Sequence, residues 1–245
     1  MHRFKIQTRD NSHFEIAGEE LHHLVHVMRL TIDSNVVGFD NSGGQWLGII
    51  ETLTKEAASC RIIEEEFPVV EAKTRVYLVM GLAKGEKMEW VIQKGTELGM
   101  AGFVPLRTKR SVVQLEGGKA KDRVVRWQKI AAEAVKQSRR VIEPEVAAIT
   151  NWNDLGKVLP PDTQWIIPYE DEKTRSLHSC LGQLNPRFPV AILIGAEGGF
   201  SPEEVTWAQQ ELQAISVSLG NRILRTETAA LAALTMVLAH YGDLG

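Results

Sequence analysis

The sequence has few cysteines and no long hydrophobic run. Its two cysteines, Cys60 and Cys180, are far apart and show neither C-x-x-C spacing nor clustered histidines, which argues against a disulfide framework and against a zinc site. The longest nearly apolar stretch, residues 228–239, is too short to span a bilayer, and no charged-then-apolar leader precedes Met1. We therefore expect a cytoplasmic protein with no membrane anchor and no metal.

The sequence also lacks the common phosphate-binding motifs. Neither G-x-G-x-x-G nor G-x-x-x-x-G-K-[ST] occurs, so a dinucleotide-binding fold and a P-loop nucleotidase lose their main sequence support. Internal repeats and low-complexity tracts are absent as well. With 245 residues, 44% of them hydrophobic, the chain can form one large domain or a small and a medium one.

The formal net charge of −3 hides a strong asymmetry along the chain. Residues 73–140 contain 16 Lys and Arg against 6 Asp and Glu, whereas residues 1–69 contain 6 against 11. A basic segment of this kind is typical of a surface that binds nucleic acid through its phosphates. The alternative is a solvated, charged helix face, and the charge count alone does not separate the two.

Residues 1–69 read as a small β-rich module. Strands are expected at 36–40, 45–50 and 59–63, with a hairpin turn at 41–44, and apolar spacing predicts a helix over 19–29. A short barrel would accommodate these elements.

From residue 75 onward, apolar strands alternate with helices. This alternation predicts a parallel sheet covered by helices, that is, an α/β fold. Ser201 followed by Pro202 is typical of a helix start. The last helix is small or apolar nearly all round, so it is either buried inside the domain or part of a dimer interface. Strands are expected at 76–82, 102–106, 165–169, 191–194 and 215–219, and helices near 86–98, 121–139, 201–213 and 227–241.

Two glycine-bearing segments near the end of the chain each follow an apolar strand and precede a helix. They are Ile194-Gly195-Ala196-Glu197-Gly198-Gly199-Phe200 and Leu219-Gly220-Asn221-Arg222-Ile223-Leu224-Arg225-Thr226-Glu227-Thr228-Ala229. Such loops gather at the carboxyl edge of an open α/β sheet, so we expect one shared pocket. Their glycines allow a ligand to lie against bare backbone, whose N–H and C=O groups can read an adenine edge or a ribose. Glu197 would repel a polyphosphate and favour a cationic ligand.

The two segments resemble the RsmE family of ribosomal RNA methyltransferases in the SPOUT superfamily, whose patterns read roughly I-G-P-E-G-G-[FL] and L-G-x-R-[IV]-L-R-x-E-T-A. Ala196 stands where the family usually has proline, which bears on the rigidity of the loop. The resemblance extends over nearly the whole chain through further motifs: His22-His23-Leu24 with Val27-Met28-Arg29, Lys84-Gly85-Glu86-Lys87-Met88-Glu89 with Gln93-Lys94-Gly95-Thr96-Glu97-Leu98-Gly99, and Glu133-Ala134 with Gln137-Ser138 and Arg140.

The resemblance implies a PUA-like RNA-binding domain over residues 1–69 and a SPOUT methyltransferase domain over residues 73–245, with a trefoil knot. It further implies a homodimer that uses S-adenosylmethionine to methylate N3 of a uridine in 16S rRNA of the small ribosomal subunit. The cofactor would be bound by Tyr169, Ile194, Gly195, Ala196, Glu197, Gly198, Gly199, Leu219, Gly220, Ile223, Leu224 and Thr226.

Methylation of a uracil imide requires a base or stabilisation of the uridine anion. Arg225 is the first candidate for binding the anion or a phosphate, because a guanidinium stays charged and offers paired donors. Glu197 and Glu227 are candidate bases. The alternative for Arg225 and Glu227 is an ion pair that holds the loop to the last helix.

A further group of mostly basic residues is expected to contact RNA: Arg3, Arg29, Lys84, Lys87, Arg107, Arg110, Gln137, Arg139 and Arg140. Gln137 is a candidate for bonding the target base, with an ordinary helix-surface glutamine as the alternative. His22 and His26 share a helical face, but without a third ligand they favour packing or capping over metal binding. The target nucleotide should be unpaired, because N3 is hidden in a base pair.

Two other functions remain open from the sequence. One is a different SPOUT reaction, either ribose 2′-O or guanine methylation. The other is a non-catalytic RNA-binding factor in ribosome assembly.

Overall fold

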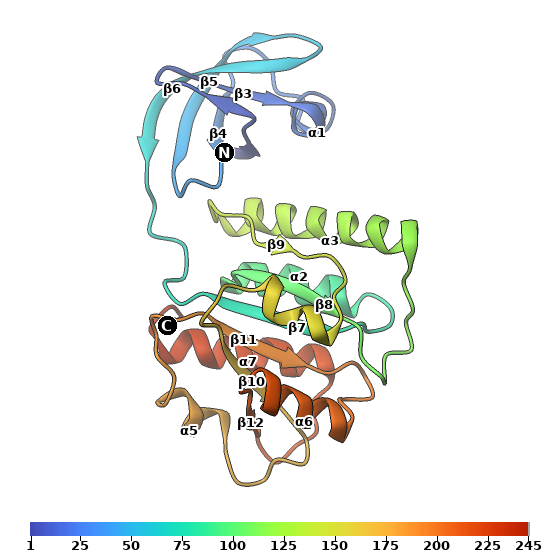
Figure 1. The fold of residues 1–245 in the computed structure, drawn as a ribbon. Helices are drawn as coiled ribbons and strands as arrows, with labels where there is room; N and C mark the ends of the chain where they lie inside the picture. Colours follow the sequence, from blue (N-terminus) through green and yellow to red (C-terminus); the bar gives the residue numbers. More distant parts are fainter. Residues whose placement is uncertain (245) are drawn as a thin grey trace. The chain divides into compact units, whose positions relative to one another are not determined.

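The computed structural model describes residues 1–244 and divides into two compact units (Figure 1). Unit 1 comprises residues 1–71 and 135–143, and unit 2 comprises residues 72–134 with the chain from Pro144 onward. The break near residue 71 lies close to the predicted domain boundary. Residues 135–143 belong to the first unit although they lie far along the chain, and the sequence did not predict this. The reason is that Val135 and Val141 are buried against Phe39.

Unit 1 is built on a six-stranded sheet in the order β1-β4-β5-β6-β3-β2, in which only the β1 and β4 pair is parallel. A short helix follows β3 and passes directly into a π-helical turn. The elements are β1 (His2–Lys5), β2 (Thr8–Arg9), β3 (His13–Ala17), α1 (Gly18–His22), η1 (His23–Val27), β4 (Asn35–Phe39), β5 (Gln45–Leu53) and β6 (Ala57–Glu66).

The sheet of unit 1 closes on itself through its first strand. β1 pairs with β4, and the next residue, Ile6, donates its N–H to the carbonyl of Phe39 at 2.9 Å. Gln7 then donates to the carbonyl of Glu15 on β3 at 2.8 Å, and β2 continues along β3. One bent strand therefore joins both edges of the sheet, which removes free edges as a barrel does. The predicted short barrel is confirmed.

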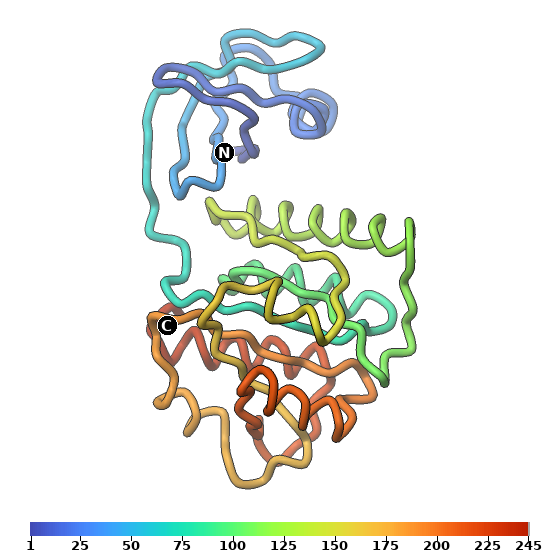
Figure 2. Tube along the Cα trace, in the orientation of Figure 1, coloured from blue at the N-terminus to red at the C-terminus, as the bar shows by residue number. Residues whose placement is uncertain are grey.

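Unit 2 contains a second six-stranded sheet, in which every neighbouring pair is parallel. Its order is β12-β10-β11-β7-β8-β9, so β11 lies between β10 and β7, as the trace in Figure 2 shows. The strands are β7 (Val76–Gly81), β8 (Gly102–Leu106), β9 (Glu145–Val146), β10 (Gln164–Pro168), β11 (Val190–Ile194) and β12 (Ile215–Val217).

Helices cover both faces of this sheet. Alternate residues of β11 enter two different hydrophobic clusters, one with α2, α3, α5 and α7, the other with α4 and α6. A strand buried on both faces reads as a continuous apolar run, which is why these strands could be predicted. The helices are α2 (Lys87–Leu98), α3 (Gly117–Ser138), η2 (Trp152–Asp154), α4 (Leu155–Val158), α5 (Leu177–Leu181), α6 (Pro202–Glu211) and α7 (Thr226–His240).

Local signals at the helix ends match the structure. Ser201 caps α6, and Glu204 returns a side-chain bond to the Ser201 N–H, forming a capping box. Gly99 ends α2 with φ +106°, a conformation that favours glycine. The α/β fold with a parallel sheet is confirmed, and the trefoil knot stays a prediction.

Within residues 1–244, no helix is long and apolar enough to cross a membrane. His22 and His26 lie with ring centroids 4.6 Å apart, and across the same described residues no group of three or more His, Cys, Asp or Glu could hold a metal ion.

Candidate functional site

The carboxyl ends of β10, β11 and β12 surround a cavity of about 370 Å³ in unit 2. This volume falls within the range of about 300–1,000 Å³ that is usual for small-molecule sites. Ligands of open α/β sheets bind at this edge. The lining residues are Lys87, Pro168, Tyr169, Glu170, Lys173, Ile194, Gly195, Ala196, Glu197, Gly199, Ser218, Leu219, Gly220, Asn221, Arg222, Ile223, Leu224, Arg225, Thr226, Glu227 and Ala229.

The structure brings the two glycine-bearing segments together around one cavity, as expected. Every residue predicted to bind the cofactor is among the lining residues except Gly198, and so are the candidates Arg225, Glu197 and Glu227. Their contacts with a ligand remain predictions. We call residues 195–199 the glycine loop and residues 219–225 the arch.

The glycine loop is tightly packed at its start. A Cβ on Gly195 would lie 2.8 Å from the Cα and carbonyl carbon of Gly199, so no side chain fits there without a backbone shift. The N–H of Gly199 donates to the Ala196 carbonyl at 2.9 Å, which closes a turn. A Cβ on Gly81, at the end of β7, would lie 2.7 Å from the Ala196 nitrogen. The loop is thus restrained by close backbone contacts, although Ala196 replaces the family's usual proline.

Glu197 is held by residues that follow β7. Its Oε1 accepts bonds from Lys87 Nζ at 2.8 Å and from the Lys84 backbone N–H at 2.9 Å. Burial raises the pKa of the Glu197 carboxyl, but the bonds from Lys87 and the backbone amides outweigh burial, and the pKa lies below its ordinary value. Lys87, predicted to contact RNA, therefore lies at the cavity and is paired there.

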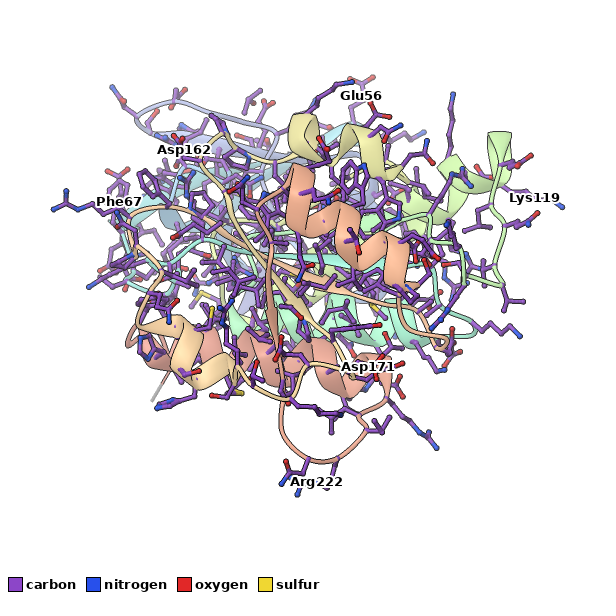
Figure 3. All side chains as sticks on the ribbon, turned by 60° about the horizontal axis from the view of Figure 1, so that its bottom comes forward. Glu56, Phe67, Lys119, Asp162, Asp171 and Arg222 are labelled. Carbon is purple, nitrogen blue, oxygen red and sulfur yellow. The ribbon has the colours of Figure 1, made fainter. Side chains whose placement is uncertain are left out.

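The other side of the cavity is formed by the arch, which is largely exposed. Gly220 has φ +114°, and a Cβ there would have no neighbour within 4 Å, so its constraint is conformational rather than steric. Ile223 is 79% exposed, although it is among the residues predicted to bind the cofactor. Arg222 lies at the outer tip of the arch (Figure 3).

The start of α7 connects the two loops. Thr226 Oγ1 donates to the Gly195 carbonyl at 2.5 Å, so its hydroxyl joins the arch to the glycine loop. Glu227 has one buried carboxylate oxygen, Oε2, with no hydrogen-bond partner. The ion pair between Arg225 and Glu227, which the sequence left open as an alternative, is not found among the described residues.

The end of β10 contributes polar groups to the same cavity. Burial is the largest cause that raises the pKa of the Tyr169 phenol, and a hydrogen bond with Asp171 raises the pKa further. This side chain therefore stays neutral. Lys173 Nζ donates to the Glu170 carbonyl at 2.5 Å. Lys173 was not predicted to line the cavity, because it follows β10 without a motif. No role was predicted for Arg222 and Asn221 either, although both lie inside the second glycine-bearing segment.

The residues predicted to contact RNA fall into two groups in the structure. Arg29, Lys84, Arg110, Gln137 and Arg139 are exposed. Arg107 is half-buried and donates to the Leu115 carbonyl, and Arg110 donates to the Gly198 carbonyl at 2.9 Å.

Two predicted RNA contacts are engaged within unit 1 instead. Arg140 is only 5% exposed, and its Nη2 lies 2.7 Å from Glu71 Oε2. Arg3 donates to Gln45 and to the Arg140 carbonyl, and its guanidinium lies over the ring of Phe39. Burial lowers the pKa of Arg3. These contacts leave both side chains little access to a phosphate, which favours a structural role.

Comparison with known proteins identifies the family. An RNA methyltransferase domain matches residues 70–238, and an RNA methyltransferase PUA domain matches residues 16–63. The ribosomal RNA small subunit methyltransferase E of Bacillus subtilis (strain 168) is 35% identical over 237 residues, which cover 95% of this chain and 92% of that protein. The chain belongs to the ribosomal RNA small subunit methyltransferase E family.

Solved structures agree with this membership. A methyltransferase of the same name from Neisseria gonorrhoeae, bound to S-adenosyl methionine, superposes with a TM-score of 0.87 at 28% identity and covers 100% of both chains. A Legionella pneumophila protein described as a methyltransferase in complex with the cofactor SAM has a TM-score of 0.80 at 27% identity over 97% of each chain. The whole fold, including both units, is therefore that of the RsmE family.

Proposed function

We propose that this chain transfers the methyl group of S-adenosylmethionine to N3 of a uridine in 16S rRNA of the small ribosomal subunit. Membership of the family supports the general activity, which is S-adenosylmethionine-dependent methylation of ribosomal RNA. The observation that carries the site is the cavity at the ends of β10, β11 and β12, where the glycine loop and the arch meet.

The residues around the cavity fit this cofactor. Gly220 leaves the arch backbone open for the adenosyl group to approach, because nothing occupies the space beside its Cα. Glu197 remains a carboxylate at neutral pH and tolerates a cation nearby, although Lys87 already offsets part of its charge. When bound, the cofactor supplies a methyl group that its sulfonium has already activated. The protein must then mainly position the two reactants and manage one proton.

Of the two candidate bases, Glu227 is the better supported. Glu197 has a lowered pKa and two donors on Oε1, and both features make it a weak base. Glu227 lines the cavity and keeps a buried oxygen with no partner. We assign to Glu227 the role of the base that accepts the N3 proton. We assign to Arg225 the stabilisation of the developing uridine anion, because its guanidinium is exposed and forms no ion pair with a carboxylate within residues 1–244.

We further propose that the exposed basic residues, Lys84 first among them, contact RNA phosphates, with unit 1 as an additional RNA-binding domain. In the family the enzyme is a homodimer, and we propose the same state here and action in the cytoplasm. The partly buried residues Leu231, Ala232 and Met236 on α7 leave apolar surface that a second copy could cover.

The assignment is tested by incubating the purified protein with small ribosomal subunits and S-adenosylmethionine labelled in its methyl group. Digestion to nucleosides should place the label in N3-methyluridine. A labelled ribose methyl or methylguanine would refute the uridine N3 assignment but would leave the assignment as an RNA methyltransferase intact. No binding of S-adenosylmethionine or S-adenosylhomocysteine at millimolar concentration would instead favour a non-catalytic assembly factor.

A further inference from the structure

Two basic side chains from outside the cavity strands reach the exposed part of the glycine loop. Lys87 begins α2, which follows β7, and its Nζ lies 2.8 Å from Glu197 Oε1. Arg110 lies in the segment after β8, and its Nη1 donates to the Gly198 carbonyl at 2.9 Å. These bonds fall on adjacent residues of the loop.

The exposed part of the loop has few other restraints. Its start is fixed by the close approach of Gly195 to Gly199 and by the bond from Thr226. Glu197 and Gly198 are exposed, and besides Lys87 and Arg110 they are held by the Lys84 backbone N–H. A Cβ on Gly198 would lie 3.0 Å from Arg110 Cβ, so the arginine stem also packs against this peptide.

We propose that Lys87 and Arg110 are positioning residues that hold Glu197 and Gly198 in the shape that binds S-adenosylmethionine, rather than contacts for RNA. The inference rests on the proposed function, because it requires the glycine loop to bind this cofactor. It deepens that function by dividing the basic segment, residues 73–140, between two tasks. Lys84 bonds to the loop only through its backbone N–H, which leaves its exposed side chain for RNA, whereas Lys87 and Arg110 bond to the loop through their side chains.

The geometry separates an effect on binding from an effect on stability. The side chains of Lys87 and Glu197 are 32% and 33% exposed, and ion pairs at such exposure add little to folding stability. Loss of the pair therefore leaves the unfolding midpoint nearly unchanged. It frees the loop, so that cofactor binding must order the loop again, which weakens affinity.

The test measures cofactor affinity of the full chain by calorimetry with S-adenosylmethionine. Lys87→Met and Glu197→Gln should each weaken binding about tenfold, the size of one charge-assisted hydrogen bond. Glu197→Gln also removes the negative charge at the cavity, so the double variant should bind no more weakly than Glu197→Gln alone, because Lys87 then has no carboxylate to hold. Arg110→Met should weaken binding several-fold, and Lys87→Arg should restore most of the affinity lost in Lys87→Met.

Lys84→Met is the matched control. Its backbone N–H still bonds to Glu197, so cofactor affinity should stay at the wild-type value while affinity for ribosomal RNA falls. Lys87→Met should show the reverse pattern, with the KM for the cofactor raised, kcat retained and RNA affinity unchanged.

Wild-type affinity in both Lys87→Met and Arg110→Met overturns this inference alone, as does a double variant whose losses multiply. Absence of cofactor binding in the wild-type protein overturns the proposed function and this inference together.

Discussion

The two loops that line the cavity differ in how they are restrained. The glycine loop receives bonds from Lys87, Arg110 and Thr226 and closes its own turn between Ala196 and Gly199. Residues 220–223 of the arch are exposed, and at its start Ser218 bonds to Gly220. The glycine loop is held by side chains that are distant in the sequence, whereas the bond at the start of the arch comes from Ser218, two residues before Gly220.

This difference separates two kinds of glycine. At Gly195 the neighbouring backbone leaves no room for a side chain, so any substitution disturbs the packing of the domain. At Gly220 the space is open and only the positive φ demands glycine. Substitution of Gly195 should therefore affect folding and cofactor binding together, and substitution of Gly220 should affect binding alone.

The largest effect is expected for Gly195→Ala. The added Cβ forces the glycine loop away from Gly199, which should lower the free energy of unfolding by about 1–3 kcal/mol and abolish measurable cofactor binding. Denaturant unfolding and calorimetry check both results. Gly156→Ala is the control: it lies in α4 with open space around its Cβ, and it should leave both quantities near wild type. If Gly195→Ala bound the cofactor with wild-type affinity, the glycine loop would not be part of the cofactor site.

Gly220→Val should affect binding without a matching loss of stability. Valine resists φ +114°, so the arch must adopt another backbone conformation, and because residues 220–223 are exposed this change leaves the packing of the domain intact. We expect cofactor affinity to fall at least tenfold, RNA affinity to be largely kept, and the unfolding midpoint to move little. A fall in thermal stability equal to that of Gly195→Ala would erase the distinction between the two loops.

Thr226→Val tests the bond that joins them. The substitution keeps the side-chain shape but leaves the Gly195 carbonyl without its hydroxyl donor, at a cost of about 1 kcal/mol. Cofactor affinity should fall several-fold, and Thr226→Ser should retain it because serine keeps the hydroxyl. Equal affinities in the valine and serine variants would mean that the two loops act independently.

Much of the fold could be predicted because its signals are local. Strands buried on both faces give apolar runs, and Ser201 marks the start of α6. β9 was missed because a strand of two residues has no periodicity, and the bent strand from β1 to β2 because its pairing depends on distant partners. The expected helix over residues 19–29 is instead a short α-helix followed by a π-helix, which apolar spacing does not distinguish.

The candidate site could also be located from local signals, because its glycines and the ends of its strands are visible in the sequence. Pairings between distant residues could not be predicted. Lys87 and Glu197 are separated by 110 positions, and nothing in a charge count indicates that they bond. Likewise, the sequence does not distinguish the buried Arg140, paired with Glu71, from the exposed Arg139 beside it. Charge alone therefore overstates the surface available to RNA.

The smallest expected effect concerns pH, and it tests the restrained loop, because Glu197 in that loop has a lowered pKa. Folding lowers the pKa of Glu197, so its carboxylate, and the bond to Lys87, persist below the ordinary glutamate pKa of about 4.3. The stabilisation is present above that value and lost as the pH falls through the lowered pKa. Cofactor affinity of the wild type, measured by calorimetry, should thus stay level from pH 7 to about pH 5. Circular dichroism at each pH verifies that the protein is folded. Glu197→Gln should lie lower by a constant factor over this range. A decline of wild-type affinity near pH 6 that Glu197→Gln lacks would show a raised pKa, and would mean that Lys87 does not hold this carboxylate in solution.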